Sequence, residues 1–243
     1  STMANQLSGP VMVAAQQVHA SSSTRLHKLG ELVIGNDGRA YRYAEAGATA
    51  LVAGTLQQSQ AQDTDTQDLT AVAAAVGDLS IVSTTTVTVT ANEYAEGFAT
   101  IGVTPGVGRI YKIKGHVAFT TAAPTFTLDN DPIIVALTTG SRIDATANPY
   151  AAVVQAATTF TGPNVGVACH ATAISEFGWL QVWGTTVLLA DGALVIGEPV
   201  IRSNGVAGAV EPATTTFTVQ GDVGYALTGV ATTEYGAVNL RLP

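Results

Sequence analysis

The histidines and the one cysteine are the side chains best suited to nucleophilic chemistry in this sequence. A hydrolytic triad requires a histidine within reach of a nucleophile and an acid. Cys169 and His170 are adjacent, and adjacent residues of a strand face opposite sides of a sheet, so this pair is badly placed to form a dyad. The remaining histidines are His19, His27 and His116, and no Gly-x-Ser-x-Gly motif accompanies them. The sequence therefore predicts no catalytic residue and no enzyme.

Two acidic segments contain the residue types of a cation site. Residues 63–68 (DTDTQD) loosely imitate a calcium loop, but Asp68 stands where glycine is required and Ala74 where a bidentate glutamate is required. Residues 129–132 (DNDP) have ordinary turn chemistry, with a bound cation as the minor alternative. The glycine-rich residues 102–109 lack the Gly-Lys-Ser/Thr ending of a phosphate-binding loop and lead into a strand. We predict no metal and no cofactor.

The two tryptophans are the residues whose spacing suggests a binding surface. Trp179 and Trp183 lie four apart in FGWLQVWG, and this spacing places both on one face of a strand. A shared face could form an aromatic platform for a sugar, or it could anchor a core or a subunit interface, and packing is the favoured role. Leu180 and Val182 would line the opposite face, so we expect this strand to be buried on both sides.

Alternation of small apolar residues with threonine defines the expected strands. Residues 86–90 (TVTVT) place valine on one face and threonine on the other. Residues 29–44 predict a hairpin, because Asp37-Gly38 supplies the positive φ angles of a tight turn. Turn clusters separate short strands about every 8 to 12 residues, as in sandwiches and barrels. The predicted fold is mainly β, an antiparallel β-sandwich or barrel with a flexible N-terminal arm and at most one or two short helices.

Changes in composition divide the chain into three predicted parts. Residues 1–28 are small and polar at first and predict the arm. Residues 29–78 contain the hairpin, a solvent-exposed polar linker at 57–68, and a segment at 69–76 (LTAVAAAV) that could be a short helix or could begin a strand. Residues 79–243 are the predicted β-rich main domain.

Charge is scarce along the whole sequence. Charged residues make up 12% of the chain, about half the usual share, and 18 acidic against 10 basic residues give a formal net charge of −8. Nucleic-acid binding requires clustered Lys and Arg, so no nucleic-acid partner is expected. No apolar run approaches the roughly 20 residues of a membrane-spanning helix, and no signal peptide is visible. We therefore expect synthesis in a reducing cytoplasm and stability from packing or assembly.

Short motifs follow one another in a fixed order between residues 92 and 242. They are NEYAEGFATI (92–101), GRIYKIKGHVAF (108–119), DPIIVAL (131–137), NPY (148–150), GWLQVWGTTVLLADG (178–192), RSNGVAGAVE (202–211) and VGYALTGVATTEYGAVNLRL (223–242). In this order they resemble structural proteins found in the virion heads of tailed bacteriophages, and the resemblance covers residues 29 to 243. The closing pattern, Gly-x-Ala-Leu and a terminal apolar strand, is similar to that of phage capsid decoration (cement) proteins.

The resemblance implies a structural role on a virus particle. Proteins of this kind bind the outer surface of the shell, often as homotrimers, and an arm at residues 1–24 would contact the major capsid protein by β-augmentation. The implied location is the capsid surface of a virion assembled in the host cytoplasm. The alternative is a tail or head-fibre adhesin, in which Trp179 or Trp183 stacks on a host glycan.

Overall fold

The fold is mainly antiparallel β, as the sequence predicts. The computed structural model describes residues 11–13, 17–213 and 222–242. Strands account for 44% of the structure, and the sheets are curled into half-barrels. Within the described residues the helical elements are two 3-10 turns, η1 (Gln17–His19) and η2 (Thr64–Thr66).

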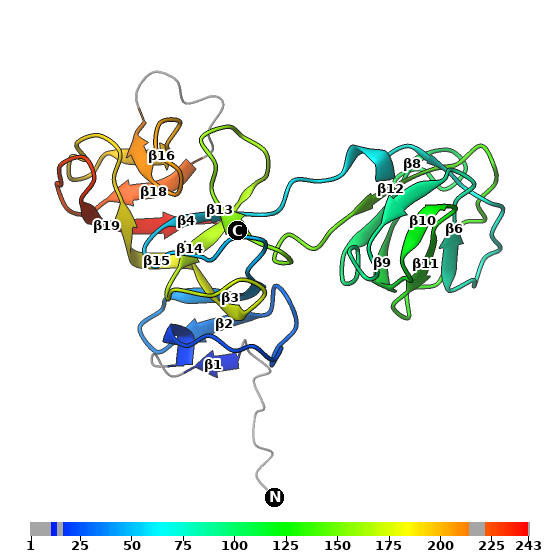
Figure 1. Ribbon diagram of the computed structural model, residues 1–243, viewed down its shortest axis with the longest axis horizontal. Helices are drawn as coiled ribbons and strands as arrows, with labels where there is room; N and C mark the ends of the chain where they lie inside the picture. The colour runs from blue at the N-terminus through cyan, green and yellow to red at the C-terminus, as the bar shows by residue number, and fades with distance from the viewer. Residues whose placement is uncertain (1–10, 14–16, 214–221, 243) are drawn as a thin grey trace, which may run out of the picture. The chain divides into compact units, whose positions relative to one another are not determined.

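The chain forms two compact units rather than the three predicted parts (Figure 1). Unit 1 combines residues 1–60 with 149–243, and unit 2 is the continuous segment 61–148. The predicted boundary at residue 78 falls inside unit 2, because the strand at residues 69–70 pairs with a strand at 142–146. A composition change along the chain cannot reveal such a long-range pairing.

Unit 1 is built on one large sheet whose central strand is 13 residues long. This strand, β15, pairs with β3 through its first half and with β19 through its second half. Buried residues on both sides of it, such as Trp179 and Leu180, belong to the apolar clusters of the unit. Along the main path the strands are β1 (Val11–Val13), β2 (Leu32–Gly35), β3 (Ala40–Glu45), β15 (Phe177–Leu189), β19 (Tyr235–Arg241), β18 (Asp222–Ala226), β16 (Pro199–Arg202) and β17 (Val210–Pro212), with β4 (Leu56–Gln58), β13 (Val154–Gln155) and β14 (Asn164–Ala168) joined beside β15.

Unit 2 has a six-stranded sheet and a separate two-stranded pair, drawn in cyan to green in Figure 1. Val87 and Val89 are buried in its core while Thr86 and Thr88 are exposed, which confirms the alternation predicted for 86–90. Phe126 and Ile113 are fully buried in the same core. The six strands in order are β5 (Leu69–Thr70), β12 (Arg142–Thr146), β8 (Phe98–Val103), β9 (Ile110–Gly115), β11 (Thr125–Leu128) and β6 (Ser80–Val82), and the pair is β7 (Val87–Val89) with β10 (Phe119–Ala122).

The predicted hairpin is present, and part of the predicted arm is attached to the sheet. The turn between β2 and β3 closes with a hydrogen bond from the Gly38 N–H to the Gly35 carbonyl, and Gly38 has a φ of +80°. Residues 1–10 and 14–16 of the arm lie outside the described residues. Farther along, Ser22 and Phe177 exchange two backbone hydrogen bonds. Residues 17–28 are therefore part of unit 1 and do not form a free arm.

The predicted exposed linker at 57–68 is wrong at its beginning. Gln57, Gln58 and Ser59 are 0%, 2% and 1% exposed. They are buried because β4 pairs with β13 and β14, and because the amide groups of the two glutamines bond to the surrounding chain. The segment at 69–76 begins with strand β5, so of the two alternatives the strand is confirmed.

Candidate functional site

The two tryptophans do not share a surface. Trp179 is 7% exposed and packs in an aromatic cluster, with its ring centroid 5.0 Å from that of Tyr43 and 5.1 Å from that of His27. Trp183 is 51% exposed. Trp179 therefore packs in the core, in line with the favoured role, and of the two tryptophans Trp183 is the one available to a ligand.

A β-bulge separates the two side chains. Gln181 pairs with Tyr41, but the next pair joins Trp183 to Ala40, so two residues of β15 oppose one residue of β3. An extra residue interrupts the regular alternation of faces, and beyond it Trp183 is exposed whereas Trp179 is buried. Gly184 follows with a φ of +84° and continues the bend. The strand is buried on both sides only before the bulge.

A buried glutamine holds this bulge in place. Gln181 is 2% exposed, and its amide donates to the carbonyl of Trp183 at 3.1 Å and to that of Thr185 at 2.9 Å. Satisfying two carbonyls from inside the protein stabilises the bent backbone. The role of Gln181 was missed from the sequence. A polar residue inside an apolar strand, three positions before a glycine, is the signal that could have shown it.

Trp183 borders an open groove of about 740 Å³ in unit 1. Thr185 extends from the same strand, and Asn239 from β19 lies directly opposite Thr185 in the ladder. Leu227 and the β2–β3 turn complete the lining. The groove therefore combines one exposed aromatic face with hydroxyl and amide groups.

The turn that walls the groove is fixed by an ion pair. The Arg39 Nε lies 2.6 Å from a carboxylate oxygen of Asp37, and the Arg39 backbone N–H donates to the other oxygen at 3.1 Å. These two hydrogen bonds lower the pKa of Asp37. The turn can approach β15 because Gly184 has no side chain: a Cβ there would lie 3.1 Å from the Arg39 Cγ. The turn thus lies close against β15, and its two charges are paired with each other.

Cys169 and the histidines have structural surroundings. His170 is exposed, and the Cys169 thiol is partly buried, which raises its pKa to about 12. His116 is 7% exposed, accepts the Tyr94 backbone N–H at its Nε2 (3.1 Å) and stacks on Phe119. His116 is thus a core residue.

We expect the Cys169 thiol to react slowly in the folded protein. A thiol with a pKa of about 12 holds almost no thiolate at pH 8, and the thiolate is the reactive form. Labelling with Ellman's reagent at pH 8 should be at least about tenfold slower in the native protein than in urea. Equal rates in the two conditions would show that the thiol ionises normally.

The acidic segments are engaged in hydrogen bonds within unit 2. An Asp63 oxygen accepts the Asp65 N–H at 2.9 Å at the start of η2, and the Asp68 N–H donates to Asp144 at 2.7 Å. Asp131 accepts the Lys112 N–H at 2.8 Å. In the described part of the chain, no group of three or more His, Cys, Asp or Glu side chains is placed to hold a metal ion.

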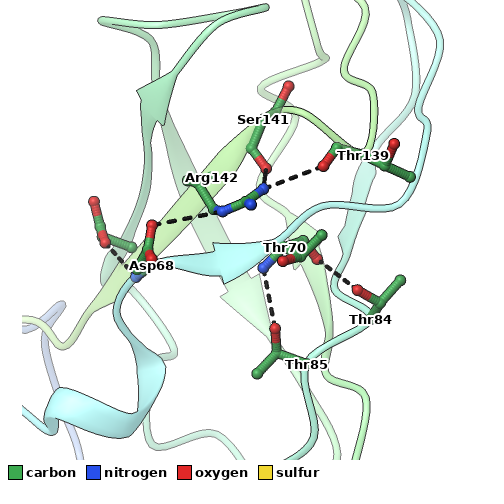
Figure 2. A network of polar contacts seen from close by, with 8 residues as sticks. Asp68, Thr70, Thr84, Thr85, Thr139, Ser141 and Arg142 are labelled. Atoms are coloured by element: carbon green, nitrogen blue, oxygen red, sulfur yellow. Dashed lines mark hydrogen bonds and ion pairs between the residues drawn. The ribbon is translucent and has the colours of Figure 1, made fainter.

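A polar network in unit 2 joins the ends of β5 and β12 (Figure 2). Arg142 donates to the carbonyls of Thr139 and Ser141 at 3.1 and 3.2 Å, and its Nε lies 3.7 Å from Asp68. The Thr70 N–H donates to the Thr85 hydroxyl at 3.1 Å. Arg142 is one-third exposed, so these contacts hold the edge of the sheet together at a position that remains open to solvent.

A second arginine, in unit 1, is buried. Arg202 is 2% exposed and donates to the carbonyls of Ala157, Thr159 and Gly162 and to the side-chain oxygen of Gln58. No carboxylate pairs with it among the described residues, and burial lowers its pKa. Arg202 therefore fixes the loop at 157–162.

Comparisons with protein-family models, curated proteins and solved structures found no match for this chain. No helix in the described ranges is both long and apolar enough to cross a membrane. What the protein does must be inferred from its own residues and surfaces.

Proposed function

We propose that this protein is a structural component of a tailed-bacteriophage virion, a capsid decoration protein that binds the outer surface of the major capsid shell as a homotrimer. The observation that supports the proposal is that the exposed side chains of strands β7, β10 and β11 in unit 2 are uncharged and mostly threonine. They include Thr88, Thr120 and Thr121 on the β7–β10 pair, and Thr125 and Thr127 on β11 of the six-stranded sheet.

Threonine at these positions suits repeated subunit contacts. Removing a lysine or glutamate from water costs far more than removing a hydroxyl that finds a hydrogen-bond partner. Interface cores are accordingly depleted of charge. Uncharged strand surfaces can be covered by another copy or by the shell, and the net charge of −8 disfavours adherence to DNA.

Light scattering coupled to size-exclusion chromatography tests the assembly. We expect a trimer at micromolar concentration, and a stable monomer would contradict the proposal. The double variant Thr88→Asp/Thr127→Asp should reduce assembly because it places charge on the outward positions of β7 and β11. Thr49→Asp, at an exposed turn of unit 1, is the matched control and should assemble normally.

Binding to shells tests the capsid role itself. The purified protein is mixed with mature shells of the cognate major capsid protein that lack decoration, and sedimentation shows whether it is bound. We expect saturable binding. Failure to bind mature shells would contradict the capsid role and move the protein to the tail.

A further inference from the structure

We propose that the groove beside Trp183 binds a neutral pyranose unit of a glycan chain. This proposal is independent of the capsid role, since it rests on the lining of one groove in unit 1. A sugar ring has one face of C–H groups and a rim of hydroxyls, and the groove offers a partner to each.

The exposed indole provides the apolar partner. Half of the Trp183 side chain is open to solvent, and Leu227 lies in the same lining. Stacking the C–H face of a sugar on this ring would remove apolar surface from water on both sides. The buried Trp179 cannot contribute to that contact.

The polar partners stand beside the indole on neighbouring strands. Thr185 and Asn239 are directly opposite in the β15–β19 ladder, so their Cβ atoms are about 5 Å apart. Among the described residues, neither side chain has a hydrogen-bond partner inside the protein. A hydroxyl and an amide both donate and accept hydrogen bonds, as sugar hydroxyls do.

The charges around the groove indicate an uncharged ligand. Asp37 is paired with Arg39, and its carboxylate retains lone pairs that can accept hydrogen bonds from hydroxyls. Arg241, across the ladder from Trp183, is stacked 5.2 Å over the Tyr225 ring and donates to its hydroxyl at 3.0 Å. With each charge already engaged, an anionic or cationic ligand gains little over a neutral one.

The groove is shaped before any ligand arrives. The Gln181 amide fixes the carbonyls of Trp183 and Thr185, and Gly184 lets the Asp37–Arg39 turn close against β15. A site that needs no rearrangement loses less entropy on binding.

An array of neutral oligosaccharides of glucose, galactose, mannose and N-acetylglucosamine tests the proposal, followed by fluorescence titration with the best ligand. We expect binding to at least one glycan, and Trp183→Ala should weaken it by about tenfold or more. Asn239→Ala should weaken it by a smaller factor. Tyr235→Ala is the matched control, since Tyr235 is an exposed aromatic of the same sheet outside the groove lining, and it should bind normally.

Three results would overturn the sugar site. They are an array on which the unaltered protein binds no glycan, a Trp183→Ala variant that keeps full affinity, and a Trp183→Ala variant whose oligomeric state changes. The last result would assign Trp183 to a subunit interface. Circular dichroism shows whether each variant has kept its fold, and Trp183→Phe, which retains an aromatic face, should recover part of the affinity.

Discussion

Replacing Arg202 by methionine is expected to destabilise unit 1 by about 3 kcal/mol or more. Methionine can fill much of the volume, but it donates no hydrogen bond. The carbonyls of Ala157, Thr159 and Gly162 would then lose their donor in a site from which water is largely excluded. An unsatisfied buried acceptor costs about 1–3 kcal/mol, and here several lose their partner together.

The two tryptophans make this effect measurable in unit 1 alone. Trp179 and Trp183 both belong to unit 1, and the sequence contains no others. Urea unfolding followed by tryptophan fluorescence should therefore show a lower midpoint for Arg202→Met. Arg142→Met is the matched control, because Arg142 also donates to backbone carbonyls but is one-third exposed and lies in unit 2. It should leave the fluorescence midpoint unchanged.

Arg202→Lys separates the donor geometry from the charge. Lysine keeps the positive charge but has three donors on one nitrogen in place of the planar five-donor fork. Lysine cannot reach the Ala157, Thr159 and Gly162 carbonyls at once. The Arg202→Lys variant should therefore be destabilised almost as much as the Arg202→Met variant. A lysine variant as stable as the original protein would show that charge alone is sufficient there.

Local signals in the sequence predicted the features that neighbouring residues determine. Asp37-Gly38 gives the β2–β3 turn because its φ requirement is set within four residues. The alternation at 86–90 gives the correct buried and exposed faces because the side-chain period of a strand is two. The mainly β class follows from many such signals.

Features that depend on distant pairing could not be predicted. Residues 200–205 (VIRSNG) contain the turn signal Asn204-Gly205, and nothing local in them indicates that Arg202 is buried. Arg202 is buried only because the loop at 157–162 folds over it. The polar segment at 57–59 is buried for the same reason, since its partners lie beyond residue 150.

The sequence pointed to Trp183 as a candidate residue but not to the other residues that line the groove. Both tryptophans were named as candidates, with packing favoured over a platform; Trp179 does lie in the core, whereas Trp183 is exposed. The period of two fails across the bulge between Gln181 and Trp183, and a bulge reflects how β3 and β15 are paired. The groove also needs Asn239 and the β2–β3 turn, which only the folded sheet brings together.

Replacing Gly97 by alanine is expected to destabilise unit 2 by about 3 kcal/mol. A Cβ at this buried position would overlap the backbone carbonyl oxygen of Thr146, and it would also press on the Tyr94 carbonyl at 3.0 Å. Backbone atoms cannot move aside as the end of a flexible side chain can. The Gly97 carbonyl also accepts the Ile113 N–H at 3.0 Å, so a shift of the residue would strain the β8–β9 pairing.

Gly102→Ala, in strand β8 of the same unit, is the matched control for Gly97→Ala. Gly102 is exposed, and an added Cβ would meet only the side-chain end of Asp144 at 3.3 Å. Alanine in a strand is favoured over glycine by about 0.5–1 kcal/mol, so this variant should be neutral or slightly stabilising. Hydrogen-exchange mass spectrometry on peptides from 61–148 should show faster exchange for Gly97→Ala alone. The tryptophan unfolding transition reports unit 1 and should be unchanged in both variants. Equal exchange in the two variants would mean that the Thr146 backbone relaxes to admit the methyl group.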